Sequence, residues 1–178
     1  MKAFIAAAAL VVLAPALALA QKTSFDYDKS TDFSKFKTYT LKDGTKVGQP
    51  LIDKRIDTAI EEQLAAKGLT RNDSAPGIVV VYHVAFDKQK DITTFSSGGY
   101  GGYGYGWGGG WGTTDVRVNE ILVGTLVIDI ADAAKKEVVW RGMGVKEVDT
   151  QAKADKRDKN ITSAVTKIFK NFPPQKKG

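Results

Sequence analysis

Two long stretches rich in β-branched and aromatic residues lie close together in the second half of the chain. The first stretch, residues 116–132, is "VRVNEILVGTLVIDIAD", and the second, residues 135–148, is "KKEVVWRGMGVKEV". They join at the turn-like "ADAAKK", residues 131–136. Residues of this kind favour strands, and two strands joined by so short a connection pair as an antiparallel hairpin. The chain must therefore fold around an antiparallel sheet, and we expect Trp140, in the middle of the second stretch, to pack beneath a helix.

Shorter segments complete the pattern. Residues 24–28 and 37–41 alternate like strands, and "GIVVVYHVAF" at 77–86 predicts a strand that is buried on at least one face. Apolar residues at helical spacing predict one helix from Pro50 to Gly68 and a second from about Thr150 to Pro173. The order β, helix, β, β, β, helix predicts an α+β fold, an antiparallel sheet of about four strands with both helices on one face.

The tract "GGYGGYGYGWGGGWG", from Gly98 to Gly112, does not fit this pattern, because ten of its fifteen residues are glycine. Fixing its backbone would cost about 15–30 kcal/mol, whereas burying its five aromatic side chains would contribute only about 7–15 kcal/mol. We therefore expect a mobile loop between two paired strands, which presents its aromatic side chains to an envelope protein, a glycan or a lipid surface. The alternative is a tolerated insertion without a partner. The candidate binding residues are Tyr100, Tyr103, Tyr105, Trp107 and Trp111.

The N-terminus has the three parts of a secretory signal peptide. Lys2 precedes an apolar run that is too short to span a membrane, and "ALA" at residues 18–20 provides small residues for cleavage. Cleavage after Ala20 would leave a single mature domain, residues 21–178, that is periplasmic or secreted and soluble. The sequence contains no cysteine, which excludes disulfides, thiolate zinc sites and a lipid anchor on cysteine. We expect no transmembrane anchor in the mature chain.

Positive charge is concentrated at the C-terminal end. The chain has a formal net charge of +6, and residues 151–178, which include a basic tail at 173–178, contain eight basic and two acidic residues. Such a segment favours anionic surfaces such as lipid head groups or acidic polysaccharide. The alternative is a solvated helix face, because Lys156, Lys159, Lys167 and Lys170 fall opposite the apolar side of the predicted helix.

The sequence indicates no catalytic site and no metal site. His83 is the single histidine, so the sequence lacks the ligands of a typical zinc site. A serine triad needs a histidine positioned by an acid, and the sequence shows no recognisable setting for one. Glu61 and Glu62 point different ways on a helix, and the pair Asp129 and Asp132 lies at the end of the predicted hairpin, where aspartate favours turns. We expect a protein that is not an enzyme.

The glycine tract also matches the dinucleotide-binding pattern G-x-G-x-x-G twice, at residues 99–104 and 104–109. That fingerprint requires a helix directly after the glycines, and here the following sequence is strand-like. The tract contains no arginine or lysine, so it lacks the electrostatic attraction that dominates nucleic-acid binding. We expect no cofactor and no nucleic-acid partner.

Five segments together resemble a known family. They are "FDYDKSTDFSKFKTY", "IDKRIDTAIEEQLAAKGL", "IVVVYHV", the Gly/Trp/Tyr tract and "VGTLVIDIADAAKKEVVWRGMG". They resemble the bacterial envelope family known as domain of unknown function 4136, from about Phe25 to Phe172. The resemblance implies a single domain and no catalytic residue. Many relatives have an acceptor cysteine at the signal cleavage site, where this chain has Gln21.

Three function classes remain. The first is a non-catalytic exported envelope domain that binds another envelope component through the tract, a sheet edge or both. The second is a periplasmic carrier of a small apolar or lipid ligand, held in a pocket between sheet and helices. The third is an enzyme whose site the sequence does not reveal.

Overall fold

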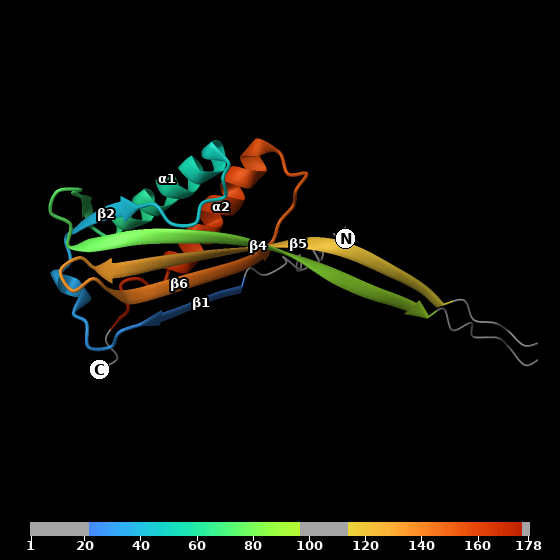
Figure 1. Cartoon of the computed structure of the whole chain (residues 1–178), viewed down its shortest axis with the longest axis horizontal. Coiled ribbons are helices and arrows are strands. Elements are labelled where there is room, and N and C mark those ends of the chain that lie inside the picture. Colours follow the sequence, from blue (N-terminus) through green and yellow to red (C-terminus); the bar gives the residue numbers. More distant parts are fainter. Residues whose placement is uncertain (1–21, 97–113, 176–178) are drawn as a thin grey trace, which may run out of the picture.

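A computed structural model describes residues 22–96 and 114–175 and places two helices on one face of a six-stranded sheet (Figure 1). The strand order across the sheet is β1-β6-β5-β4-β2-β3. Most neighbouring strands are antiparallel, but β2 is parallel to both β3 and β4. The elements are β1 (Lys22–Tyr27), a 3-10 turn (Phe33–Lys35), β2 (Thr38–Lys42), α1 (Pro50–Ala66), β3 (Thr70–Arg71), β4 (Ile78–Ser96), β5 (Thr114–Asp132), β6 (Glu137–Glu147) and α2 (Ala154–Phe169).

The α+β class and the two helices agree with the sequence prediction, but the predicted sheet of about four antiparallel strands needs correction. The sheet has six strands and is mixed. The parallel pairing arises because α1 lies between β2 and β4 in the chain, and a helical crossover returns the chain in the same direction rather than as a hairpin.

Each helix packs one apolar stripe on the sheet. On α1 the stripe is formed by Ile56, Ile60 and Leu64, four residues apart and all buried. Pro50 occupies the first helical turn, where its missing N–H is not needed. Gly68, just beyond the helix, has a φ of +80°, a conformation that glycine adopts without strain.

The core lies between the sheet and the helices and includes Trp140, as predicted. Trp140 is 1% exposed, and its ring centroid is 5.8 Å from that of Phe169 on α2 and 5.3 Å from that of Phe172. The other large apolar side chains that are fully buried are Tyr82, Phe169, Ile60, Leu64, Ile78, Ile128, Ile130, Ile168, Val80 and Val165. The predicted lysine stripe of α2, Lys156, Lys159, Lys167 and Lys170, is exposed.

β4 and β5 extend beyond the rest of the sheet as a two-stranded ribbon (Figure 1). β6 accompanies β5 only as far as Val123, whereas β4 and β5 stay paired until Ser96 meets Thr114. The glycine tract with its five predicted binding residues falls between these two strand ends and lies outside the described residues. Within the described parts of the chain, neither helix is both long and apolar enough to span a membrane.

Candidate functional site

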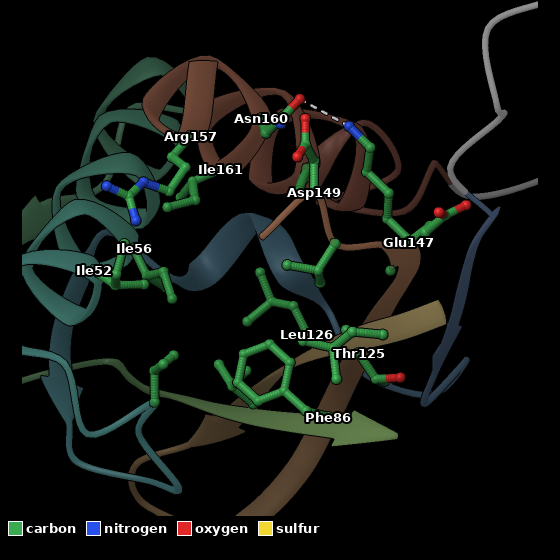
Figure 2. Close-up of a pocket in the computed structure, with 18 of the residues that line it drawn as sticks. Ile52, Ile56, Phe86, Thr125, Leu126, Glu147, Asp149, Arg157, Asn160 and Ile161 are labelled. Carbon is green, nitrogen blue, oxygen red and sulfur yellow. Dashed lines mark hydrogen bonds between the residues drawn. The ribbon is translucent and has the colours of Figure 1, made fainter. Parts of the chain in front are cut away.

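A cavity of about 510 Å³ lies between the helix-facing side of the sheet and the two helices (Figure 2). Its volume is within the range of typical ligand pockets. Half of the residues that line it are apolar. They are Val47, Ile52, Ile56, Val84, Phe86, Leu122, Leu126, Val148, Ile161 and Ala164.

The floor of the cavity is formed by two rows of residues that run across β4, β5 and β6. One row is Val84, Leu126 and Gly144, and the next is Phe86, Gly124 and Lys146. Each row contains a glycine, so part of the floor has no side chain. The row at the opposite end of the sheet, Val80, Ile130 and Trp140, consists of large, fully buried side chains. The core is therefore filled at one end and hollow at the other.

The helices form the walls. Ile52 and Ile56 lie one turn apart on α1, and Ile161 and Ala164 occupy adjacent turns of α2. Figure 2 shows Ile52, Ile56 and Ile161 facing the side chains of Phe86 and Leu126 on the sheet. Phe86 is 49% exposed, although it is a large apolar residue, because it stands where the cavity opens.

Polar groups gather on the side of the cavity where α2 begins. Arg157 and Asn160 are one turn apart on α2, and Figure 2 shows the Arg157 side chain reaching from α2 toward α1. Lys146, at the end of β6, donates a hydrogen bond from Nζ to Oδ1 of Asn160 at 2.8 Å. Along α2 the cavity wall thus changes from polar at Arg157 to apolar at Ala164.

Two acidic residues, Asp149 and Glu147, also line this side of the cavity. Asp149 forms an ion pair with a lysine, and Glu147 points away from the cavity. Asp149 Oδ2 lies 2.8 Å from Nζ of Lys156, and this hydrogen bond, with help from the Gln151 and Ala152 N–H groups, lowers the pKa of Asp149. Glu147 follows Lys146 in β6, so alternation directs its side chain to the opposite face of the sheet, and Figure 2 shows its carboxylate turned away from the cavity.

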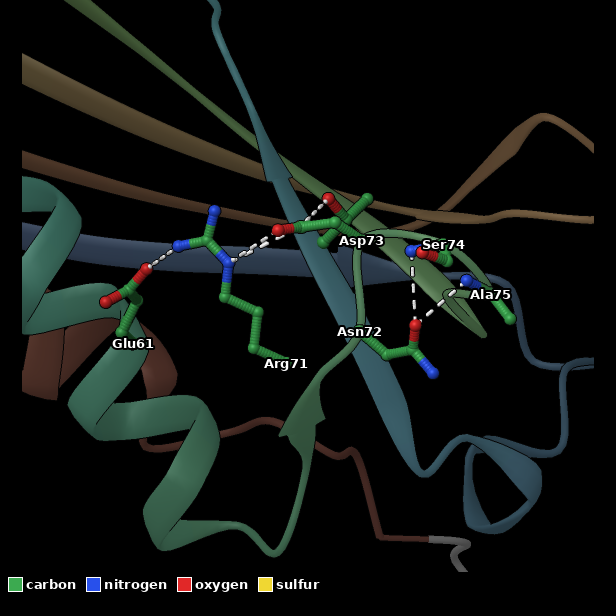
Figure 3. A network of polar contacts seen from close by, with 7 residues as sticks. Glu61, Arg71, Asn72, Asp73, Ser74 and Ala75 are labelled. Carbon is green, nitrogen blue, oxygen red and sulfur yellow. Dashed lines mark hydrogen bonds and ion pairs between the residues drawn. The ribbon is translucent and has the colours of Figure 1, made fainter.

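A second polar cluster lies at the other end of α1 and has a structural role (Figure 3). Arg71 forms an ion pair with Glu61 of α1, and its Nε lies 3.1 Å from Asp73. Asp73 also accepts a 2.6 Å hydrogen bond from the Thr40 hydroxyl, and this bond is the main cause of its lowered pKa. Asn72 accepts from two backbone N–H groups of the turn. These contacts fasten the turn after β3 to α1 and β2.

His83, Asp129 and Asp132, which were weighed as catalytic candidates, have structural partners. His83 Nδ1 accepts a hydrogen bond from the Thr45 N–H at 3.1 Å. Asp129 forms a two-pronged ion pair with Arg141, at 2.6 and 2.7 Å. Asp132 accepts hydrogen bonds from the N–H groups of the β5–β6 turn and from Lys35, so its interpretation as a turn residue is confirmed. Within residues 22–96 and 114–175, no three acidic or histidine side chains group as metal ligands.

Comparison with known proteins identifies the family. Residues 23–174 match the family described as domain of unknown function, DUF4136. The chain belongs to this family. The resemblance noted in the sequence is thereby confirmed over nearly the whole of the described chain. Among curated proteins, none matches the sequence.

Solved structures with similar folds include two proteins at low sequence identity. One is a PDZ domain protein from Parabacteroides distasonis, with 19% identity and a TM-score of 0.56; the match covers 89% of this chain but 36% of that protein. The other is the PelC dodecamer from Paraburkholderia phytofirmans, with 11% identity and a TM-score of 0.50, covering 84% of this chain and 95% of PelC. At these identities the similarity concerns the fold alone.

A sheet–helix pocket was one of the alternatives that the sequence left open, but its residues were not predicted. The structure supplies Phe86, Gly124, Gly144, Lys146 and Arg157. The available signal was the alternation in "WRGMGVK", which places Trp140, Gly142, Gly144 and Lys146 on one face of a strand.

Proposed function

We propose that this protein is a non-catalytic, exported module of the bacterial cell envelope that binds a small apolar ligand in its sheet–helix cavity. The observation that carries the proposal is the cavity of about 510 Å³ with aliphatic and aromatic walls. Water in such a space lacks hydrogen-bond partners, so replacing it with an apolar ligand is favourable. The predicted signal peptide supports the exported location.

Binding of the probe N-phenyl-1-naphthylamine to the mature chain tests the proposal. Its fluorescence rises on entering an apolar site, and we expect saturable binding at one site per chain. Ala164→Phe and Ile161→Phe, which fill the cavity from α2, should remove this binding. Ser163→Phe is the matched control, because Ser163 lies on the same helix and is exposed. Equal binding by all four proteins, or none by the wild type, contradicts the proposal.

Mass spectrometry of the purified protein provides an independent test. A cavity that holds an apolar ligand should retain one from the cell, and organic extraction should release it. The same extraction from Ala164→Phe should yield markedly less. Equal amounts from both proteins would mean that the extracted lipid does not occupy the cavity.

A second candidate function rests on the β4–β5 ribbon. Beyond the last pairing with β6 the two strands pair only with each other among the described residues, and an isolated two-stranded hairpin is of marginal stability. Such a ribbon would hold the segment that connects β4 to β5 at a distance from the helix-covered part of the sheet. That connection is the tract Gly98 to Gly112, which would present Tyr100, Tyr103, Tyr105, Trp107 and Trp111 to an envelope protein, a glycan or a lipid surface.

Replacing residues 98–112 with an Asn-Gly turn tests this second function. We expect the domain to keep its unfolding midpoint while losing the partners that the wild type captures from envelope extracts. A second variant, in which serine replaces all five aromatic residues, keeps the length of the tract. Loss of folding on deletion, or unchanged capture by both variants, contradicts the role of the tract.

A further inference from the structure

The two cations that line the cavity differ from neighbouring cations in their ion pairing. Among the described residues, no carboxylate forms an ion pair with Arg157 or Lys146, whereas the neighbouring Arg55 and Lys156 are paired with Asp158 and Asp149. The partner of Lys146 is the neutral amide oxygen of Asn160. The charges of Arg157 and Lys146 therefore have no ion-pair partner among the described residues.

The charge of Lys146 is placed where it is costly without a counter-ion, whereas Arg157 is exposed. Lys146 is half-buried, and a charged group removed from water is unfavourable unless it is paired. The alternation of β6 brings Lys146 to the helix-facing side, next to Gly124 and Phe86 in the same row across the sheet. Its aliphatic stem thus begins beside the apolar floor, and its ammonium group reaches Asn160 on α2 instead of pointing to solvent on the far face.

The geometry points to a specific ligand class: we propose that the cavity binds an amphiphile with one alkyl chain and an anionic head group, with the head held by Arg157 and Lys146. This inference rests on the proposed function. The alkyl chain occupies the space between Phe86, Leu126, Ile56 and Ile161, all of which line the cavity. The head lies at the polar end, where the planar guanidinium of Arg157 can donate two parallel hydrogen bonds to a carboxylate or a phosphate.

The arrangement of α2 gives the ligand a direction. Arg157 and Asn160 lie nearer the N-terminus of the helix, and Ile161 and Ala164 follow on the same side one and two turns later. A molecule with a polar head and an apolar chain matches this gradient, whereas a cationic amphiphile would place its charge beside Arg157 and Lys146. A neutral one would leave both cations unpaired.

Displacement of N-phenyl-1-naphthylamine by four ligands with the same chain tests the inference. The ligands are dodecanoate, dodecyl phosphate, dodecanol and dodecyltrimethylammonium, each below the concentration at which it forms micelles. Because a charge-assisted hydrogen bond is strong, we expect both anions to bind at least about tenfold more tightly than dodecanol. The cation should bind most weakly, and added salt should weaken the anions alone. The ranking of carboxylate and phosphate identifies which head group the site prefers.

Substitutions at the two cations separate charge from packing. Arg157→Gln and Lys146→Gln should each remove most of the preference for anions while leaving binding of the neutral probe intact. Lys146→Met keeps the apolar stem and covers the case in which Lys146→Gln disturbs folding. Lys159→Gln, an exposed position on α2 with the same loss of charge, is the matched control and should retain the full preference.

The outcomes distinguish this inference from the function on which it rests. If dodecanol binds as tightly as dodecanoate, or if the Arg157 and Lys146 variants keep the preference for anions, the inference is wrong. The proposed function, binding of an apolar ligand in the cavity, then still holds. If the wild type does not bind the neutral probe at all, the proposed function fails and the inference fails with it.

Discussion

The indole ring of Trp140 covers the α-carbon of Gly142 on the helix-facing side of β6. A Cβ atom at position 142 would lie 2.3 Å from Cη2 of Trp140 and 2.5 Å from Cγ2 of Ile168 on α2. Both distances are far below van der Waals contact, so residue 142 must be glycine for the largest core side chain to lie flat on the strand. The filled end of the core depends on this pair.

Gly142→Ala should therefore destabilise the domain. The added methyl group must displace the indole ring or α2, and overpacking of this kind costs about 1–3 kcal/mol. Urea denaturation measures the change in the unfolding free energy. The same substitution in a Trp140→Leu background should cost less, because the ring that obstructs the methyl group is gone. Equal costs in both backgrounds would mean that Trp140 does not restrict position 142.

Trp140→Ala should cost about 3–5 kcal/mol of unfolding free energy. The side chain is 1% exposed and stacks on Phe169 at an interplanar angle of 26°, so its removal leaves a cavity between β6 and α2. Met143→Ala serves as a comparison, because Met143 is 37% exposed and lies on the same strand. A cost well under about 1 kcal/mol for Trp140→Ala would show that the site collapses or that the ring is not buried.

Acid stability should depend on Asp28. Its carboxylate accepts hydrogen bonds from the hydroxyl of Thr31 and from the hydroxyl and N–H of Ser30, which lower its pKa from 3.8 to about 2. A pKa that is lower in the folded state means that this group stabilises the fold above about pH 4, and that the effect is lost as the pH falls through about 2.

Asp28→Asn should accordingly lower the unfolding free energy at neutral pH, and the difference from the wild type should shrink as the pH falls from about 4 to about 2. Thr31→Val removes the donor with the largest effect and should produce part of the same change. Denaturation curves at several pH values measure both. A difference that stays constant down to the lowest pH would contradict the role of these hydrogen bonds.

The predicted export signal has a direct test. Protein recovered from the periplasm or the medium should begin at Gln21, and its intact mass should correspond to residues 21–178 without a lipid. Ala18→Asp together with Ala20→Asp, which replaces the small residues before the cleavage site, should leave the precursor unprocessed. Wild-type protein that retains residues 1–20, or that carries a lipid, would contradict the prediction.

Local patterns predicted the elements well and their arrangement less well. The two helices, the β5–β6 hairpin and the burial of Trp140 follow from periodicity within short segments. The strand β4 was expected to end near Phe86, because Asp87, Lys88 and Gln89 break the apolar pattern. It continues to Ser96 because β5 supplies its hydrogen-bond partners. The two-residue β3 and the parallel pairing of β2 depend on distant contacts, which no local pattern encodes.

The cavity could not be predicted for a similar reason. Gly124 and Gly144 are twenty residues apart in the sequence and become part of one hollow floor only through the register that pairs Leu126 with Gly144 and Phe86 with Gly124. Lys146 and Arg157 likewise line the same cavity only through the packing of α2 on the sheet. By contrast, the five tract aromatics, which the sequence singled out, lie outside the described residues and stay a prediction.

The pairing of β1 with β6 has a consequence for the order in which the protein folds. Lys22 lies opposite Val145, so β1 has no partner on this side until β6 has been synthesised. Contacts between such distant segments form late, because a long loop must close before they are made. A nascent chain therefore cannot complete this edge of its sheet before β6 is available. Delayed closure of this kind would suit the export that the N-terminal sequence predicts, in which a polypeptide crosses a membrane before it folds.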